Sequence, residues 1–130
     1  MSELSNALSA AASGLKAQAQ RLRHVSENIS NADTPGYRRK TVSFESRRAA
    51  PGGPELVSVG RVRLDQTSLE RIFDPAHPLS DEEGYYEGSN VNLMIEIADA
   101  REAQRSYEAN LKMFDQARQM SSGLMELLRK

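Results

Sequence analysis

The 130-residue chain contains no cysteine and no tryptophan, and only 5% of its residues are aromatic. The absence of cysteine excludes disulfides, thiolate metal sites and cysteine nucleophiles. Leucine, isoleucine, valine and phenylalanine together supply 26 of the 130 residues, near the lower limit for chains that build a full core. Alanine adds 15 residues but buries little area. The composition therefore predicts a small core, and apolar surface that a partner chain covers.

Long apolar runs and a strong excess of charge are also lacking. No stretch approaches about 18 consecutive apolar residues, so no membrane span is predicted. The N-terminal sequence MSELSNALSAAASGL has no basic lead and no long apolar run, so no Sec-type signal peptide is expected. The default location would be cytosolic, unless export uses an uncleaved signal. The net charge of −1 disfavours a strongly basic nucleic-acid binder and an acidic disordered tail.

Charge is nevertheless distributed unevenly in the middle of the chain. Residues 34–64 carry seven basic and two acidic side chains, and residues 65–90 carry one basic and seven acidic. The basic stretch with its interleaved aromatics superficially resembles a nucleic-acid surface, so a small coiled-coil nucleic-acid-binding module stays open as an alternative. Because the acidic stretch follows directly, protein–protein complementarity is favoured. The predicted lateral contacts are Arg38, Arg39, Lys40, Arg47, Arg48, Asp81, Glu82 and Glu83.

Both ends of the chain have helical periodicity. Over about residues 2–29, apolar residues recur at spacings of four and three, typical of a coiled-coil seam, and Ser2 or Ser5 can cap the helix. Pro35 and Gly36 stop it. A second helix, capped by Asn90 or Asn92, is predicted to run to residue 130 without a proline, roughly 57 Å. The predicted packing residues of the two helices are Leu8, Leu15, Leu22, Val25, Ile29, Leu93, Ile97, Tyr107, Leu111, Phe114 and Leu124.

Such a long second helix cannot bury its apolar stripe on a small hairpin. We therefore expect it to pack on the first helix and on neighbouring subunits. Gly14 costs the first helix about 1 kcal/mol relative to alanine, which suggests that another backbone approaches closely there, although a weak spot in the helix is the simpler explanation.

The middle of the chain predicts a small β-rich insertion. Residues 41–64 alternate polar and apolar side chains and predict one hairpin, with an extra residue at Gly60 that suggests a β-bulge. Residues 65–89 are predicted to be loop-like, with Tyr85 and Tyr86 as a possible short edge strand. The predicted organisation is mainly α: residues 1–32 and 90–130 form one helical domain, and residues 33–89 form the insertion.

Catalytic signals are weak. His24 lies off the apolar seam, and His77 lies near Asp74 and the Asp81–Glu83 turn without matching a known metal-ligand loop. The sequence contains no G-x-S-x-G elbow, dinucleotide fingerprint or P-loop. We therefore predict no enzyme, no cofactor and no metal; an enzyme that uses the His77 turn is the weakest alternative.

The sequence motifs at the two ends resemble those of a known family. Ala12–Gln18 followed by Asn28–Arg38 resembles the N-terminal signature of bacterial flagellar rod and hook axial proteins. Asn90-Val-Asn92, Glu96 and Arg105–Asn110 are similar to the C-terminal signature. The residues that carry this resemblance are Gly14, Asn31, Thr34, Pro35, Gly36, Tyr37, Asn90, Asn92, Arg105 and Asn110. The chain length and the Asp74–Tyr85 segment resemble those of one proximal-rod member of the family. Its sibling in the proximal rod, FlgB, is the alternative.

The resemblance implies a structural protein of the basal body. The terminal helices would form an antiparallel coiled-coil hairpin lining a helical tube that serves as drive shaft and export channel, and the insertion would project outward. Implied partners are copies of the chain, the rod proteins FlgB, FlgF and FlgG, the rod-base adaptor FliE and the flagellar type III export apparatus, with no nucleic acid and no membrane insertion. The rod would cross the periplasm, and export would need no cleaved signal peptide, which replaces the cytosolic default.

Overall fold

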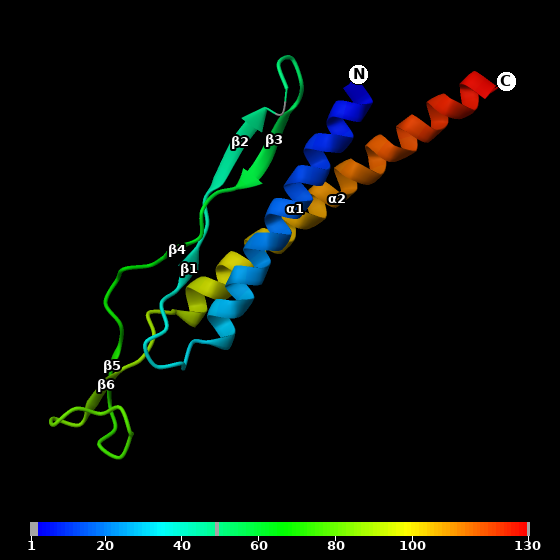
Figure 1. Cartoon of the computed structure of the whole chain (residues 1–130). Coiled ribbons are helices and arrows are strands. Elements are labelled where there is room, and N and C mark those ends of the chain that lie inside the picture. Colours follow the sequence, from blue (N-terminus) through cyan, green and yellow to red (C-terminus); the bar gives the residue numbers. More distant parts are fainter. Residues whose placement is uncertain (1–2, 49, 130) are drawn as a thin grey trace.

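The computed structural model describes residues 3–48 and 50–129. Two helices lie side by side, and three short β-ladders extend along them and past one end, so the molecule is elongated (Figure 1). α1 spans Glu3–Ser30 and α2 spans Leu93–Arg129. Both helices were predicted within a few residues, and the structure is mainly helical with small β-hairpins. Neither helix is long and apolar enough to cross a membrane.

The helix ends follow from local chemistry. Asn92 caps α2: its side-chain oxygen accepts hydrogen bonds from the backbone N–H groups of Met94 and Ile95, at 3.0 and 3.4 Å, as an N-cap residue should. Of the two serines predicted to cap α1, Ser5 lies inside the helix and does not begin it, and Ser2 lies outside the described residues. At the other end, the Asn31 side chain donates to the Glu27 carbonyl oxygen at 2.9 Å.

The two helices run in opposite directions. Contacts between them pair rising residue numbers in α1 with falling numbers in α2. Gly14 lies against Asn110, Arg21 pairs with Asp99, and Asn28 reaches Glu96. The buried apolar residues of the described chain are few and small: Ala11, Ala17, Val25, Ala103 and Ala117. The prediction of a small core is confirmed, because no large apolar side chain is fully buried in the described part of the chain.

The predicted hairpin forms in two sections. β1 (Lys40–Thr41) pairs with β4 (Arg63–Leu64), and β2 (Phe44–Arg48) pairs with β3 (Glu55–Val59), both antiparallel. Lys40 pairs with Leu64 and Phe44 with Val59, so the outgoing strand advances four positions where the returning strand advances five. The predicted extra residue is confirmed, and it divides the hairpin where the ladder changes register.

The loop predicted for residues 65–89 contains a second hairpin. β5 (Arg71–Phe73) pairs with β6 (Tyr85–Glu87), so Tyr85 and Tyr86 do form a strand, and its partner was missed. This hairpin lies at one end of the molecule, and the β2–β3 hairpin lies beside α1 towards the opposite end (Figure 1).

Candidate functional site

A buried polar junction joins the end of α1, the start of α2 and the segment between α1 and β1. Its centre is Asn28, which is 1% exposed, and Glu96, which is 0% exposed. The Asn28 oxygen accepts from the Lys40 N–H at 2.9 Å and the Tyr37 hydroxyl at 2.8 Å. Its amide nitrogen donates to the Lys40 carbonyl at 2.9 Å and to Glu96 Oε2 at 3.3 Å. Asn28 therefore uses both donors and both acceptor sites of its amide.

The charge of buried Glu96 is balanced by Arg39. The Arg39 Nε donates to Glu96 Oε1, and its Nη1 lies 4.0 Å from Asp65 Oδ2. The Arg39 backbone N–H also donates to Asn90 Oδ1 at 2.6 Å. The Arg39 guanidinium and the Asn28 amide together offset the free-energy cost of burying the Glu96 carboxylate. Removing either partner should therefore be costly.

The Asn31–Tyr37 turn brings these groups together. Thr34 Oγ1 donates to Asn31 Oδ1 at 3.1 Å, and exposed Pro35 follows. Gly36 adopts a φ of 76°, a conformation that other residues rarely adopt, and its N–H donates to the Gly88 carbonyl at 3.0 Å. The turn therefore folds the chain back from α1 onto the segment that precedes α2.

The second anchor of the junction is Asn90. Its amide nitrogen donates to the carbonyl oxygens of Asp65 at 2.9 Å and Thr67 at 3.2 Å, and Arg38 donates to the same two carbonyls, at 3.2 Å each. Asn90 thus joins two separate segments of the insertion, residues 37–39 and residues 65–67. The two asparagines at the start of the C-terminal motif have distinct structural roles. Asn90 anchors the insertion, and Asn92 caps α2.

The contact between the helices is made by small residues rather than by the predicted large ones. A Cβ added at Gly14 would lie 2.8 Å from Asn110 Oδ1, so the close approach inferred at Gly14 is real, although an Asn side chain and not a backbone makes it. The fully buried positions of α2 are Glu96, Ala103 and Ala117. Glu96 lies one position before the predicted Ile97, so the contact face at the start of α2 is rotated from the predicted stripe by about 100°. Further along, Ala103 and Ala117 lie about one turn from the predicted Tyr107 and Phe114.

The predicted packing residues differ in how far the structure buries them. In α1, Val25 is buried, Leu8, Leu15 and Leu22 are half-buried, and Ile29 is exposed. In α2, Tyr107 and Phe114 are half-buried, whereas Leu93, Ile97, Leu111 and Leu124 are 40–51% exposed. The structure thus does not show the expected coiled-coil seam within the chain. A role for these side chains between chains stays a prediction.

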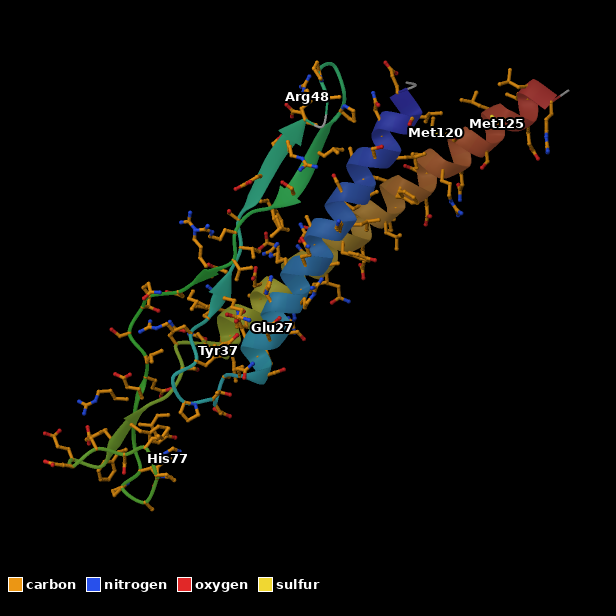
Figure 2. The ribbon with its side chains drawn as sticks, in the orientation of Figure 1. Glu27, Tyr37, Arg48, His77, Met120 and Met125 are labelled. Atoms are coloured by element: carbon orange, nitrogen blue, oxygen red, sulfur yellow. The ribbon has the colours of Figure 1, made fainter. Side chains whose placement is uncertain are left out.

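The C-terminal part of α2 carries a group of exposed apolar side chains. Since Gly14 faces Asn110, Glu3 would face roughly residue 121, so α2 extends past the described start of α1. Figure 2 marks Met120 and Met125 on this part of the helix, where the two helices have separated. Leu128 is 82% exposed. An amphipathic helix end without an intramolecular partner is a surface suited to another chain.

Most of the predicted lateral contacts have partners within the chain. Arg38 and Arg39 belong to the junction, and Lys40 Nζ donates to Glu27 Oε2 at 2.6 Å. In the hairpins, Arg48 pairs with Glu55 at 3.2 Å, and Arg71 pairs with Asp81 and Glu83 at 3.6 and 3.9 Å. Arg47 and Glu82 are exposed and have no ion pair with the rest of the described chain. The charges still free for a partner are therefore fewer than the sequence suggests.

Three carboxylates have lowered pKa values. The hydrogen bond from Lys40 lowers the pKa of Glu27 and correspondingly raises that of Lys40. Backbone and hydroxyl hydrogen bonds from Thr67 lower the pKa of Asp65, and the Tyr85 N–H lowers that of Asp81. Burial raises the pKa of Tyr37. The hydrogen bonds to the three carboxylates stabilise their charged forms, whereas burial favours the neutral form of Tyr37.

Both histidines lie against neighbouring groups of their own chain. The His77 ring stacks on Tyr86 with centroids 3.9 Å apart, and its Nδ1 accepts from the Leu79 N–H at 3.1 Å. His24 Nδ1 is buried without a hydrogen bond, 3.9 Å from Glu27 Oε1. Within residues 3–48 and 50–129, no three His, Asp or Glu side chains are grouped to hold a metal ion.

Sequence reasoning missed the residues at the centre of the junction. Asn28 and Glu96 were noticed only as parts of longer motifs, although Asn28 follows Val25 by three positions and so shares its face. Ala17 and Ala103 were missed because small residues give little hydrophobic signal. A polar residue in register with buried positions was the available clue.

Comparison with known proteins gives consistent matches. Residues 8–38 match the family model described as flagella basal body rod protein, and residues 82–127 match the C-terminal model of the flagellar basal body rod FlgEFG proteins. The flagellar basal-body rod protein FlgC of Agrobacterium fabrum is 45% identical over 99% of this chain and 98% of its own. The FlgC proteins of Borreliella burgdorferi and Aquifex aeolicus are 32% and 35% identical, over 96% and 88% of this chain and 97% and 89% of theirs. The two regions that the family models match contain most of α1 and α2, together with Asn28, Tyr37, Asn90 and Glu96 of the polar junction.

Proposed function

The chain belongs to the FlgC family of flagellar basal-body rod proteins and is a structural subunit of the rod, and from this premise we propose how it assembles. In our proposal it lies in the proximal rod and joins copies of itself and related rod proteins in a helical tube. This tube forms part of the drive shaft and of the export channel. A heterologous contact that does not close produces such an open helical array.

The observation that carries the proposal is the contrast between the interior and the surface of the helices. The chain buries alanine and glycine between α1 and α2, and leaves Leu93, Ile97, Leu111 and Leu124 substantially exposed. Burial of such side chains against a neighbour contributes about 1.5–3 kcal/mol each when complete. We propose that residues 1–32 and 90–130 form the helical domain that packs between subunits as coiled-coil-like layers. Residues 33–89 would project from it.

The proposed partners follow from the family. They are FlgB, FlgF and FlgG, the rod-base adaptor FliE and the flagellar type III export apparatus, which would carry the chain across the inner membrane without removing a signal peptide. The assembled rod would cross the periplasm. A structural role needs no catalytic residue, and the junction uses its charged groups for packing.

Two alternatives are less well supported. The curated relatives over nearly the whole chain are FlgC proteins, which favours this subunit over its sibling FlgB. A nucleic-acid-binding module is disfavoured, because Arg38, Arg39 and Lys40 already bind acceptors in their own chain. Basic groups with internal partners contribute less to phosphate binding.

Complementation tests the proposal. Cells that lack the chromosomal copy of this subunit should regain motility, and their isolated basal bodies should regain the rod, when the intact chain is supplied. A Leu111→Asp chain should be made and exported but should not complete the rod, since a charge replaces an exposed apolar contact. Complete rods in cells that lack the chain would refute the structural role. So would restored motility with rods in which the supplied chain is absent.

A further inference from the structure

A cationic hollow lies between α1 and the β2–β3 hairpin. Its volume is about 390 Å³, and its lining includes Lys16 from the helix, Arg47 from β2 and residues 56–59 of β3. No acidic residue lines the hollow. Within the described part of the chain, neither Lys16 nor Arg47 has an ion pair. Two neighbouring cations without a counter-charge repel each other and favour an anionic partner.

The walls of the hollow are partly apolar and are held in place. Ala17, Leu56 and Val57 contribute apolar surface, and Val57 is 39% exposed. The Val57 N–H donates to Ser13 Oγ at 3.0 Å, which ties the hairpin to the helix. The hollow therefore offers a preformed surface for a segment with both acidic and apolar side chains.

The chain presents such a segment at its other end. The loop between β5 and β6 contains Glu82, which has no ion pair in the described chain. It also contains Glu83, whose ion pair with Arg71 is long, at 3.9 Å, and exposed. Leu79 in the same loop is 64% exposed. The Asp81 carboxylate accepts the N–H groups of Glu83 and Tyr85 at 2.9 and 3.0 Å, so it holds the turn and leaves the glutamates at the surface. We call residues 74–84 the acidic tip.

The acidic tip and the cationic hollow cannot meet within one molecule. Figure 2 labels His77 in the tip and Arg48 on the β2–β3 hairpin, and the two lie at opposite ends of the elongated structure. A contact between them therefore requires two molecules. Because the two surfaces differ, the contact is head-to-tail and leaves a free hollow and a free tip for further copies.

We propose that the acidic tip of one copy docks in the cationic hollow of a second copy, with Glu82 and Glu83 facing Lys16 and Arg47 and Leu79 against the apolar wall. The inference deepens the proposed function and rests on it, because it names a contact by which rod subunits join. It keeps Arg47, Glu82 and Glu83 from the predicted lateral contacts and adds Lys16, whereas Arg38, Arg39 and Lys40 are engaged internally.

Cross-linking in the assembled rod tests this contact, and the absence of native cysteine makes the test clean. Chains with Arg47→Cys and chains with Glu82→Cys are co-expressed, rods are isolated, and a short bis-maleimide is added. A maleimide linker is preferable to a disulfide, since ion-paired residues exceed the about 4.4–6.8 Å between Cα atoms that a disulfide spans. We expect a dimer of this chain that contains both variants, and a ladder of larger adducts when one chain carries both cysteines.

Each other outcome overturns the proposal. Equal cross-linking with either single variant alone would indicate chance collisions or a symmetric contact. Adducts with a different rod protein only would show that the tip or hollow serves another partner. Complete rods without any adduct would refute the docking and leave the rod function intact, whereas failure of the unmodified chain to complement would instead refute the proposed function.

Charge exchange gives an independent test. Lys16→Glu with Arg47→Glu should reduce motility and rod yield by about tenfold or more, and so should Glu82→Lys with Glu83→Lys. Combining all four should restore both, because opposite charges again face each other. The matched control Glu87→Lys, on the same hairpin but outside the tip, should have little effect. No rescue by the fourfold variant, alongside unchanged circular dichroism of each chain, would contradict the contact.

Discussion

Replacing Asn28 with alanine tests whether the polar junction holds the two helices and the turn in one arrangement. The substitution removes four hydrogen bonds at once, two accepted and two donated. The Lys40 backbone loses the partner of both its N–H and its C=O, and the Tyr37 hydroxyl loses its acceptor. Glu96 keeps only Arg39 as a side-chain partner.

The expected cost follows from burial. A polar group left buried without a partner costs about 1–3 kcal/mol. Tyr37 and Lys40 are half-buried, so water can replace part of their loss, whereas Glu96 is fully buried. We therefore expect Asn28→Ala to lower the free energy of unfolding by about 3 kcal/mol, a large share of the roughly 5–15 kcal/mol typical of a domain.

Urea unfolding followed by far-UV circular dichroism measures this cost. Gln119→Ala removes an exposed amide from α2 and should change the free energy of unfolding by less than about 0.5 kcal/mol. A double-mutant cycle with Glu96→Gln should show a coupling energy of about 0.5–3 kcal/mol, as residues in one network do. A loss below about 1 kcal/mol for Asn28→Ala, or additive effects of the two substitutions, would refute the junction as a stabilising network.

The other predictions concern the helix contact, pH and the free end of α2. Gly14→Ala should lower the melting temperature because its Cβ would lie 2.8 Å from a neighbouring side chain, whereas Gly123→Ala, with nothing within 4 Å, should raise stability by up to about 1 kcal/mol. Because the folded-state pKa of Glu27 is lowered, stability should fall as pH drops below about 4.5, and Glu27→Gln should flatten that dependence in a melting series. Leu128→Asp should leave the melting temperature unchanged and prevent incorporation into isolated basal bodies.

Each of these has a clear contrary result. Equal stabilisation by alanine at both glycines would show that the contact at Gly14 can relax. A Glu27→Gln chain with the original acid dependence would assign the loss to other carboxylates, of which Asp65 and Asp81 have the same direction of pKa shift. Normal rods built from Leu128→Asp chains would show that the free end of α2 contacts no neighbour.

The elements that were predictable are those specified by local signals. α1 and α2 follow from helical periodicity that no proline interrupts, and their ends follow from Pro35 and from an asparagine cap, which the structure assigns to Asn92 rather than Asn90. The extra residue near Gly60 was visible because alternation of side chains changes phase there. The β5–β6 hairpin was half missed, because the three residues of β5 are too few to show alternation.

The contact face of the helices could not be read from the same periodicity. The pattern was set by large apolar residues such as Ile97 and Leu111, and these remain on the surface. The buried face of α2 includes Glu96 and Ala103, whose charge or small size gives no hydrophobic signal. Two faces share one helix, and a sequence read alone identifies the one with the larger side chains. That face is the one we assign to neighbouring subunits.

This division has an energetic consequence. Burying an alanine methyl contributes only about 0.8 kcal/mol, and four of the five fully buried apolar residues are alanines. Breaking a satisfied polar network such as the one around Asn28 is costly because it leaves buried polar groups without partners, but the intact network is worth little more than an apolar core of similar size would be. The intramolecular contacts therefore set the angle and register of α1, α2 and the insertion. The larger hydrophobic contribution stays on exposed side chains such as Leu93 and Leu124, where it becomes available only when another chain covers them, so assembly and full stability should be coupled.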